Sequence, residues 1–266
     1  MKNFKKISSL FISLVIVLSF AITGCSNSIK TLEDTSSEKP LNYSTETSGY
    51  SFTEMNDELI QQYPDYISVQ GKAIFDADEF SNEEKTNGTV KYTGLDSLGR
   101  CQTVSAVVTY KMREEGSERE REDMPNPSGW SYNGKSNNFK TQIDLMNGKI
   151  YKGYIYNRSH LLAKSLGGVE TENNLITGTR TQNVGKNDGN GGMAYTEEKA
   201  RNYLDSHKDQ VVYYKVTPAY NATELVPRSV FVDIKTDDGA IDEHVEVFNY
   251  AKGFSIDYMT GQVAEK

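Results

Sequence analysis

Histidine is scarce in this chain of 266 residues, and one of its three histidines, His160, stands where a predicted strand ends. Residues 154–168 read YIYNRSHLLAKSLGG, so aromatic and β-branched residues lead through Arg158 to His160 and then into an apolar, helix-prone run. An imidazole titrates near neutral pH, and it can take a proton from a water within hydrogen-bond reach. The motif therefore indicates a general base, and we expect the chain to bend between Arg158 and His160.

Asn183, Glu197 and Arg201 follow at spacings that could complete such a site. Asn183 comes after a second predicted strand, at the start of a helical turn, and its neutral amide oxygen suits a Mg²⁺ that keeps most of its waters. Glu197 and Arg201 are four residues apart in a predicted helix and so share one helix face. Arg201 could bind a phosphate through two hydrogen bonds, and Glu197 could hold a metal-bound water.

The elements that must position these residues predict an α+β domain, built on a central antiparallel β-sheet with flanking helices. The segments CQTVSAVVTYKM, QVVYYKVTPAY and LVPRSVFVDIKT are rich in β-branched residues, and the last two read as a hairpin. TEEKARNYLDSHKD is the clearest helix, with Thr196 as its cap and two glutamates near its N-terminus. The order of strand, His160, turn, strand, Asn183 and helix predicts that both residues belong to one site.

In the middle of the chain, NRSH is followed by LLAKSLGG and then by NNLITGTRTQN. This set of motifs resembles the DRGH-motif DNA/RNA non-specific endonucleases, which have a ββα-metal catalytic motif. The segments LDSLGRC, PSGW, YYKVTPAYNATELVPRSV and IDYMTGQ extend the resemblance over most of residues 65–262, with streptodornase-type secreted nucleases and DNA-entry nucleases as the nearest branches. The motifs are specific as a set, whereas NRSH alone would be a weak signal.

The resemblance implies a metal-dependent endonuclease that hydrolyses the phosphodiester bonds of DNA, and of RNA, to give 5′-phosphate ends. It implies that His160 is the general base, that Asn183 binds Mg²⁺ directly, with Mn²⁺ as an alternative, and that Glu197 binds the metal through water. The other residues at catalytic positions of the family are Arg158, Asn174 and Arg201. Contacts to the phosphate backbone predict little sequence preference.

Two residues depart from the DRGH pattern, because Asn157 replaces the Asp and Ser159 replaces the Gly. Loss of the carboxylate removes a charge beside the base, and Ser restricts a backbone position that Gly would leave free. The resemblance also implies a phosphate-binding arginine nearer the N-terminus. Its candidates are Arg113, Arg119 and Arg121.

Two other functions fit parts of the sequence. A surface lipoprotein could bind a ligand or nucleic acid on a nuclease-like scaffold without catalysis, but such a protein has no need for a base, a metal ligand and a water-orienting acid together. An HNH-type nuclease shares the core chemistry but usually has a second metal-binding histidine on the helix, where Lys186 and Asn187 follow Asn183 here. His207, at a predicted helix end, and His244, predicted to face solvent from a strand, are expected to be non-catalytic.

The first 24 residues read as a lipoprotein signal peptide, with a basic start, an apolar stretch and then the sequence ITGCSNS. This pattern resembles a bacterial lipobox, which implies that Cys25 carries a lipid; an ordinary signal peptide with a chance cysteine is the alternative. Residues 25–62 are polar and predict a disordered tether, followed by the nuclease domain at 63–266. We therefore expect an exported protein, anchored at the cell surface through Cys25.

Net charge limits how this chain could bind nucleic acid. The full chain has a formal charge of −8, and removing three lysines with the signal peptide makes it −11. A protein this acidic is not a broad nucleic-acid binder that works by charge alone. Residues 149–201, however, contain eight basic and five acidic residues and include the His160 motif. The remaining cysteine, Cys101, is expected to be a small buried residue rather than a nucleophile.

Overall fold

The structure is a computed structural model that describes residues 50–74, 76–120 and 122–266. The predicted signal peptide, Cys25 and the tether up to residue 49 lie outside these residues. Residues 50–62 belong to the folded domain, because Phe52 and Ile60 are buried in it, so the predicted tether extends too far along the chain. No helix in the described part of the chain is long and apolar enough to span a membrane.

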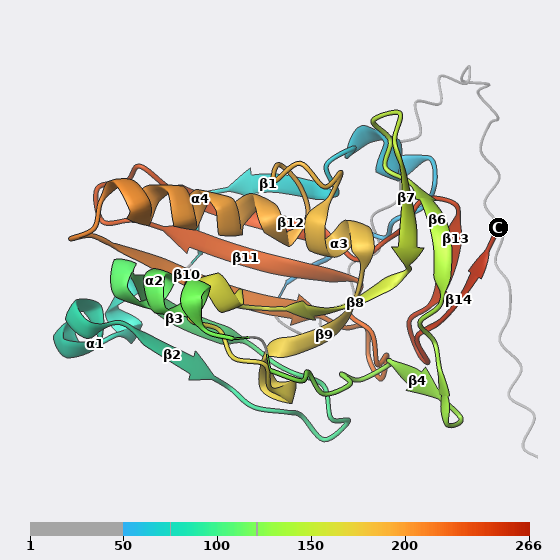
Figure 1. The fold of residues 1–266 in the computed structure, drawn as a ribbon, viewed down its shortest axis with the longest axis horizontal. Coiled ribbons are helices and arrows are strands. Elements are labelled where there is room, and N and C mark those ends of the chain that lie inside the picture. The colour runs from blue at the N-terminus through green and yellow to red at the C-terminus, as the bar shows by residue number, and fades with distance from the viewer. Residues whose placement is uncertain (1–49, 75, 121) are drawn as a thin grey trace, which may run out of the picture. The chain divides into compact units, whose positions relative to one another are not determined.

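A six-stranded antiparallel sheet forms the centre of the fold, in the order β1-β12-β11-β10-β3-β2 (Figure 1). Its strands are β1 (Ile67–Gly71), β2 (Thr89–Tyr92), β3 (Val104–Thr109), β10 (Val211–Ala219), β11 (Ser229–Lys235) and β12 (Asp242–Phe248). The predicted hairpin is confirmed, because β10 and β11 pair with Val216 opposite Val232. The prediction of an α+β fold on a central antiparallel sheet is therefore correct.

One face of this sheet packs against the long helix α4 (Met193–Ser206), which runs beside β11 in Figure 1. Val212 and Val230 of the sheet share a buried core with Ala200 and Leu204 of the helix. Cys101 lies in the same core and is 2% exposed, as predicted for a small buried residue. The alternation of buried valines along the strands therefore orients α4 over the sheet.

The opposite face of the sheet is covered by residues that precede β1 and by the segment that follows it. His244 of β12 faces this side and is only 6% exposed. Its Nδ1 lies 2.7 Å from Asp233 Oδ1, and its ring stacks on Tyr50 and Phe231. The prediction that His244 faces solvent is wrong, because a distant part of the chain covers a strand face whose polar residues suggested exposure.

A smaller hairpin and a helix form a ββα unit on the α4 side of the sheet. In this unit β8 (Tyr156–His160) pairs antiparallel with β9 (Leu175–Thr179), and α3 (Arg180–Val184) follows at once. The Thr179 side chain caps α3 by accepting a hydrogen bond from the Gln182 N–H at 3.0 Å. The hairpin therefore continues directly into the capped helix α3, at the position where the sequence predicts the site.

Helix α4 begins at Met193, three residues before the predicted cap. Gly192 precedes it with a φ of +58°, and a Cβ there would lie 2.4 Å from the Gln182 carbonyl oxygen, so glycine is required at this position. Thr196 is not a cap but lies inside the first turn. Its Oγ1 is 3.2 Å from the Met193 carbonyl oxygen and 2.6 Å from the Tyr214 hydroxyl.

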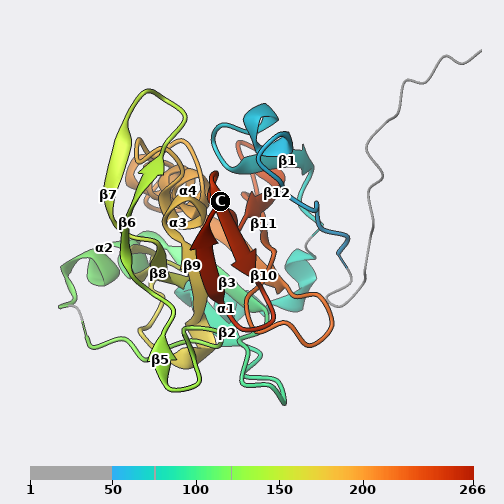
Figure 2. The same ribbon diagram turned by 90° about the vertical axis from the view of Figure 1, so that its right-hand side faces the viewer.

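The remaining elements are short and surround the ββα unit and the sheet. The other strands are β4 (Ser131–Tyr132), β5 (Lys135–Ser136), β6 (Lys140–Asp144), β7 (Ile150–Tyr154), β13 (Phe254–Asp257) and β14 (Gln262–Glu265). The other helices are α1 (Asn82–Asn87), α2 (Tyr110–Glu118) and the single turns η1 (Leu59–Gln62), η2 (Ala77–Glu79), η3 (Lys164–Leu166) and η4 (Glu172–Asn174). Figure 2 shows the β6–β7 hairpin on the same side of the sheet as β8, β9 and α3.

Candidate active site

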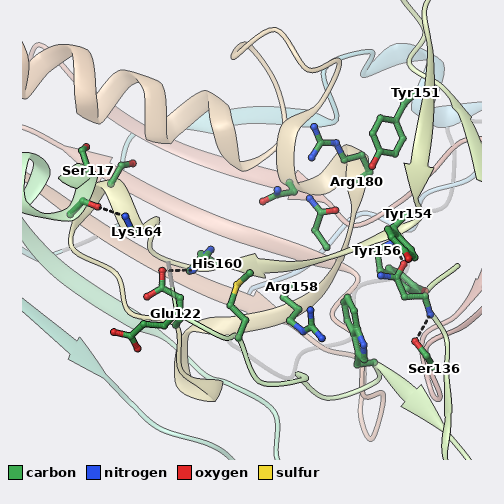
Figure 3. A pocket seen from close by; sticks show the side chains of 18 residues that line it. Ser117, Glu122, Ser136, Tyr151, Tyr154, Tyr156, Arg158, His160, Lys164 and Arg180 are labelled. Atoms are coloured by element: carbon green, nitrogen blue, oxygen red, sulfur yellow. Dashed lines mark hydrogen bonds and ion pairs between the residues drawn. The ribbon is translucent and has the colours of Figure 1, made fainter. Parts of the chain in front are cut away.

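A pocket of about 1020 Å³ opens beside the ββα unit, and residues from α2, β7, β8, α3 and several loops line it (Figure 3). Most of its lining side chains are polar or aromatic. They include Glu122, Trp130, Asn138, Tyr151, Tyr154, Asn157, Arg158, His160, Lys164, Glu170, Arg180 and Asn183. The pocket therefore brings together His160 and Asn183, the two residues that the sequence places at the centre of the site.

Strand β8 is regular, so Arg158 and His160 lie on the same face. Arg158 pairs with Thr177 and His160 pairs with Leu175 across the hairpin. Figure 3 shows both side chains directed into the pocket, because alternate residues of a strand point to one side. The predicted bend between Arg158 and His160 is wrong. The chain breaks instead at Ile155, between β7 and β8, where the buried side chain anchors the turn.

Arg158 is fixed in the pocket by two neutral neighbours. Its guanidinium stacks over Trp130 at 4.5 Å, and its Nε and Nη2 lie 3.0 and 2.6 Å from Asn126 Oδ1. Neither contact neutralises its positive charge. Arg158 is therefore oriented toward the pocket and keeps its charge for an anionic ligand.

Arg180 holds a second positive charge in the pocket, and no motif of the sequence indicated it. Its guanidinium lies 4.9 Å from the Tyr151 ring centroid, and its Nη2 donates to Asn187 Oδ1 at 2.7 Å (Figure 3). The available signal was its spacing, because Arg180 precedes Asn183 by three residues and so shares a face of the short helix α3.

Asn183 is held by the serine that replaces the family glycine. Ser159 Oγ donates a hydrogen bond to Asn183 Oδ1 at 3.0 Å, and Ser159 is fully buried. Gly178 on the paired strand makes room for this contact, since a Cβ there would lie 2.7 Å from the Ser159 Cβ. Ser159 therefore orients the amide oxygen that the sequence predicts as the metal ligand.

Glu197 and Arg201 are not among the described residues that line the pocket. Arg201 is 2.6 Å from a carboxylate oxygen of Glu198 and 3.8 Å from one of Glu197, and it donates to Ser165 Oγ at 3.0 Å. Burial raises the pKa of Glu197 to about 7, against the opposing effect of Arg201. Two carboxylates one helical turn away compensate the charge of Arg201 in this structure, and phosphate binding by Arg201 stays a prediction.

Asn174 lies inside the loop that follows His160. It is fully buried, its Oδ1 accepts a hydrogen bond from the Leu162 N–H at 2.9 Å, and its Nδ2 donates to the Leu162 and Val169 carbonyls, both at 2.9 Å. These contacts close the loop that follows His160. Asn174 therefore positions this loop, and the prediction that it supports activity stays a prediction.

The candidates for an upstream phosphate-binding arginine lie outside the pocket lining or outside the described residues. Arg113 Nε is 2.8 Å from Asp205 on α4, and Arg121 is not described. Arg119 donates to the Gly168 carbonyl and lies 3.3 Å from Glu170, a pocket carboxylate that no motif of the sequence indicated. Glu170 has no sequence signal of its own, since it lies in an irregular segment, two residues after Gly168.

Comparison with known proteins identifies relatives of the whole domain. Residues 75–261 match the family model of the DNA/RNA non-specific endonucleases. A deoxyribonuclease from Streptococcus dysgalactiae subsp. equisimilis is 34% identical over 240 residues, which cover 75% of this chain and 73% of that protein. A solved structure of Sda1 nuclease with a bound zinc ion has a TM-score of 0.71 and 37% identity, and covers 78% of this chain and 99% of that one.

A more distant structure shares the fold. It is the crystal structure of NucA from Streptococcus agalactiae with a magnesium ion bound, at a TM-score of 0.57 and 24% identity, covering 73% of this chain and 83% of that one. The family model extends over most of the chain. The chain therefore belongs to the DNA/RNA non-specific endonuclease family.

Proposed function

We propose that this protein is a metal-dependent endonuclease that hydrolyses the phosphodiester bonds of DNA and RNA with little sequence preference. The supporting observation is the pocket, in which a histidine, an amide oxygen and two arginines meet on one ββα unit. Neither Arg158 nor Arg180 has an acidic partner among the described residues, so both charges face the pocket uncompensated. An anionic substrate with several phosphates fits this arrangement.

The residues of the pocket fit a metal ion that keeps most of its water. No group of three or more His, Cys, Asp or Glu side chains suited to a metal lies in the described part of the chain. Asn183 Oδ1 is a hard, neutral oxygen, and it would bind a Mg²⁺ whose other ligands are water and phosphate oxygens. This donor set does not resemble a structural zinc site, which needs four nitrogen or sulfur ligands. Mn²⁺ is the alternative ion, and Glu197 would act through a metal-bound water.

The reaction follows from the chemistry of these side chains. His160 takes a proton from water, and the resulting hydroxide attacks the phosphorus in line. Arg158 and Arg180 hold the phosphate oxygens and offset the negative charge that develops on them. When bound, Mg²⁺ supplies Lewis-acid stabilisation of that charge and of the leaving 3′-oxygen. The products carry 5′-phosphate and 3′-hydroxyl ends, so their 5′ ends accept kinase label only after phosphatase treatment.

Replacing Ser159 by Ala should weaken metal binding. The substitution removes the hydroxyl that donates to Asn183 Oδ1, and loss of such a supporting contact typically costs about 10- to 100-fold in metal affinity. Calorimetric titration with Mg²⁺ or Mn²⁺ measures the change. Ser136→Ala is the matched control, because its hydroxyl accepts from the Asn138 N–H elsewhere in the pocket. Equal metal affinity in wild type and Ser159→Ala would refute this role.

Replacing Arg180 by Ala should weaken nucleic-acid binding and make it less sensitive to salt. Each lost phosphate contact lowers the slope of log affinity against log salt by about 0.9 on duplex DNA. The measurement is DNA binding across a salt series with Mg²⁺, in a His160→Ala background that prevents cleavage. Arg113→Ala is the control, since Arg113 is paired with Asp205. An unchanged slope for Arg180→Ala would show that Arg180 does not contact phosphate.

Substrate range is tested with plasmid, single-stranded DNA and RNA, each with Mg²⁺, Mn²⁺, Zn²⁺ or EDTA. We expect degradation of all three nucleic acids with Mg²⁺ or Mn²⁺ and none with EDTA. Degradation of DNA alone would restrict the proposal to a deoxyribonuclease. Intact nucleic acid under every metal condition would overturn the nuclease activity itself.

We also propose that the nuclease is exported and held at the outer face of a bacterial membrane by a lipid on Cys25. The support is the lipobox-like sequence around Cys25 and the basic and apolar segments before it. Membrane fractionation of cells that produce wild type or Cys25→Ser measures the anchor. Wild type should be in the membrane fraction and the variant should not; an equal distribution would contradict the anchor.

A further inference from the structure

Glu170 places a buried carboxylate directly beside His160. Its side chain is 3% exposed, and its Oε1 lies 3.9 Å from His160 Nε2. Its other oxygen, Oε2, lies 3.3 Å from Arg119 Nη2. Glu170 therefore stands between an arginine that faces away from the pocket and the histidine that faces into it.

A carboxylate in this position needs compensation, because burying an unpaired charge is costly. Arg119 supplies the compensating charge and is itself anchored, since it donates to the Gly168 carbonyl. Lys164, the other cation nearby, donates to the Gly116 and Arg119 carbonyls. Through Arg119, Glu170 is linked to the C-terminal end of α2 and to Gly168, which follows η3. Its other carboxylate oxygen, Oε1, faces the imidazole.

We infer that Glu170 is a positioning residue for His160, accepting the Nε2–H and so orienting the ring for proton transfer. The inference rests on the proposed function, in which His160 is the general base. When Nε2 carries the proton, the lone pair is on Nδ1, which is then the nitrogen that takes the proton from water. Glu170 also stabilises the imidazolium that forms. A base oriented by a third group is a recurring arrangement in enzymes that activate a nucleophile.

The distance of 3.9 Å is longer than a hydrogen bond. Catalytic hydrogen bonds are often long without substrate and shorten in the reacting complex. A purely structural role, as the partner of Arg119 alone, is the competing explanation. It predicts that loss of Glu170 lowers stability and activity together, without changing the tautomer of His160.

The test compares Glu170→Gln, Glu170→Leu and Glu170→Asp in the full-length protein. We expect kcat to fall about 10- to 100-fold in the Leu variant with little change in KM, because an unoriented base loses part of the 10²- to 10⁴-fold that proton transfer contributes. The Asp variant, which keeps a carboxylate, should retain more activity than the Gln variant. Glu246→Gln is the matched control, since Glu246 is a fully buried carboxylate bound to Thr53, Gln70 and Ser229 on the far face of the sheet.

The tautomer is measured separately from activity. The chain has only three histidines, so ¹⁵N imidazole shifts can be assigned by comparison with His160→Ala. In wild type and Glu170→Asp, His160 should carry its neutral-state proton on Nε2, and in Glu170→Leu this preference should be lost. Melting temperatures of all variants separate this effect from unfolding.

The outcomes distinguish the inference from the proposed function. If His160→Ala abolishes cleavage while the Glu170 variants keep wild-type kcat and tautomer, the inference is wrong and the proposed function stands. Loss of activity in Glu170→Gln that only tracks its melting temperature, as in Glu246→Gln, would also overturn the inference. If His160→Ala keeps full activity, His160 is not the base, and both the proposed mechanism and this inference are wrong.

Discussion

His160→Ala is expected to lower kcat by about 10²- to 10⁴-fold, the range that a positioned base contributes. The imidazole is directed into the pocket from the regular strand β8, on the same face as Arg158. Alanine keeps the strand and removes only the group that we propose takes the proton from water. The rate of plasmid cleavage under saturating Mg²⁺ measures the effect, with DNA binding measured in parallel.

His207→Ala is the control for this variant. His207 lies at the C-terminal end of α4, and its Nδ1 is 3.0 Å from the Tyr203 carbonyl oxygen. We expect His207→Ala to cleave at the wild-type rate and His160→Ala to bind DNA as tightly as wild type. A His160→Ala protein that is folded and cleaves within twofold of wild type would exclude His160 as the base.

Asn183→Ala is expected to lower Mg²⁺ affinity by more than about 100-fold, because loss of a supporting contact alone costs 10- to 100-fold. Asn183 Oδ1 is the side-chain oxygen that the family resemblance assigns to the metal, and Ser159 already orients it. Calorimetry with Mg²⁺ measures binding directly. Cleavage assays at increasing Mg²⁺ then show whether excess metal restores activity.

Asn190→Ala is the control for Asn183→Ala. Asn190 is exposed in the loop before α4, where its N–H donates to Asp188 Oδ1. It should bind Mg²⁺ as wild type does. Normal Mg²⁺ affinity in a folded Asn183→Ala protein would show that Asn183 is not the metal ligand. The proposed role of Ser159, which is to orient Asn183, would then also be wrong.

The sequence predicted the framework of the site because that framework depends on local patterns. The β-branched runs of β3, β10 and β11 indicate the sheet, and the order of strand, His160, strand and Asn183 predicts the ββα unit. The shared pocket of His160 and Asn183 follows from this order. Family membership was predicted from the same motifs and is confirmed by the family model.

The wrong predictions concern contacts between residues distant in sequence. Thr196 reads as a cap, but Gly192 permits an earlier turn that only the packing against Gln182 explains. His244 reads as exposed, but residues near Tyr50 cover it.

Glu170 and Arg180 illustrate a different difficulty. Glu170 reaches His160 only because the loop after η3 folds back, and Asn174 closes that loop through three hydrogen bonds to backbone groups. Arg180 becomes part of the pocket only when Tyr151 of β7 packs on it. Neither the Glu170–His160 contact nor the Arg180–Tyr151 contact follows from a periodic sequence pattern, so only the structure shows them.

The two departures from the DRGH pattern are compatible with a working site. Ser159 is buried and donates to the predicted metal ligand, and Asn157 lines the pocket as a neutral side chain. The pocket thus has the positive charge of Arg158 and Arg180 without a carboxylate at position 157. This balance favours an anionic substrate beside His160.

Cleavage of a closed circular plasmid tests the central claim most directly, because a circle has no ends and only an endonuclease can cut it. The purified wild-type protein is incubated with supercoiled plasmid in Mg²⁺, and separately in EDTA. We predict conversion to nicked, then linear, then fragmented DNA with Mg²⁺, and no conversion with EDTA. Plasmid that stays supercoiled with Mg²⁺, Mn²⁺ and Zn²⁺, in the presence of folded protein, would contradict the account.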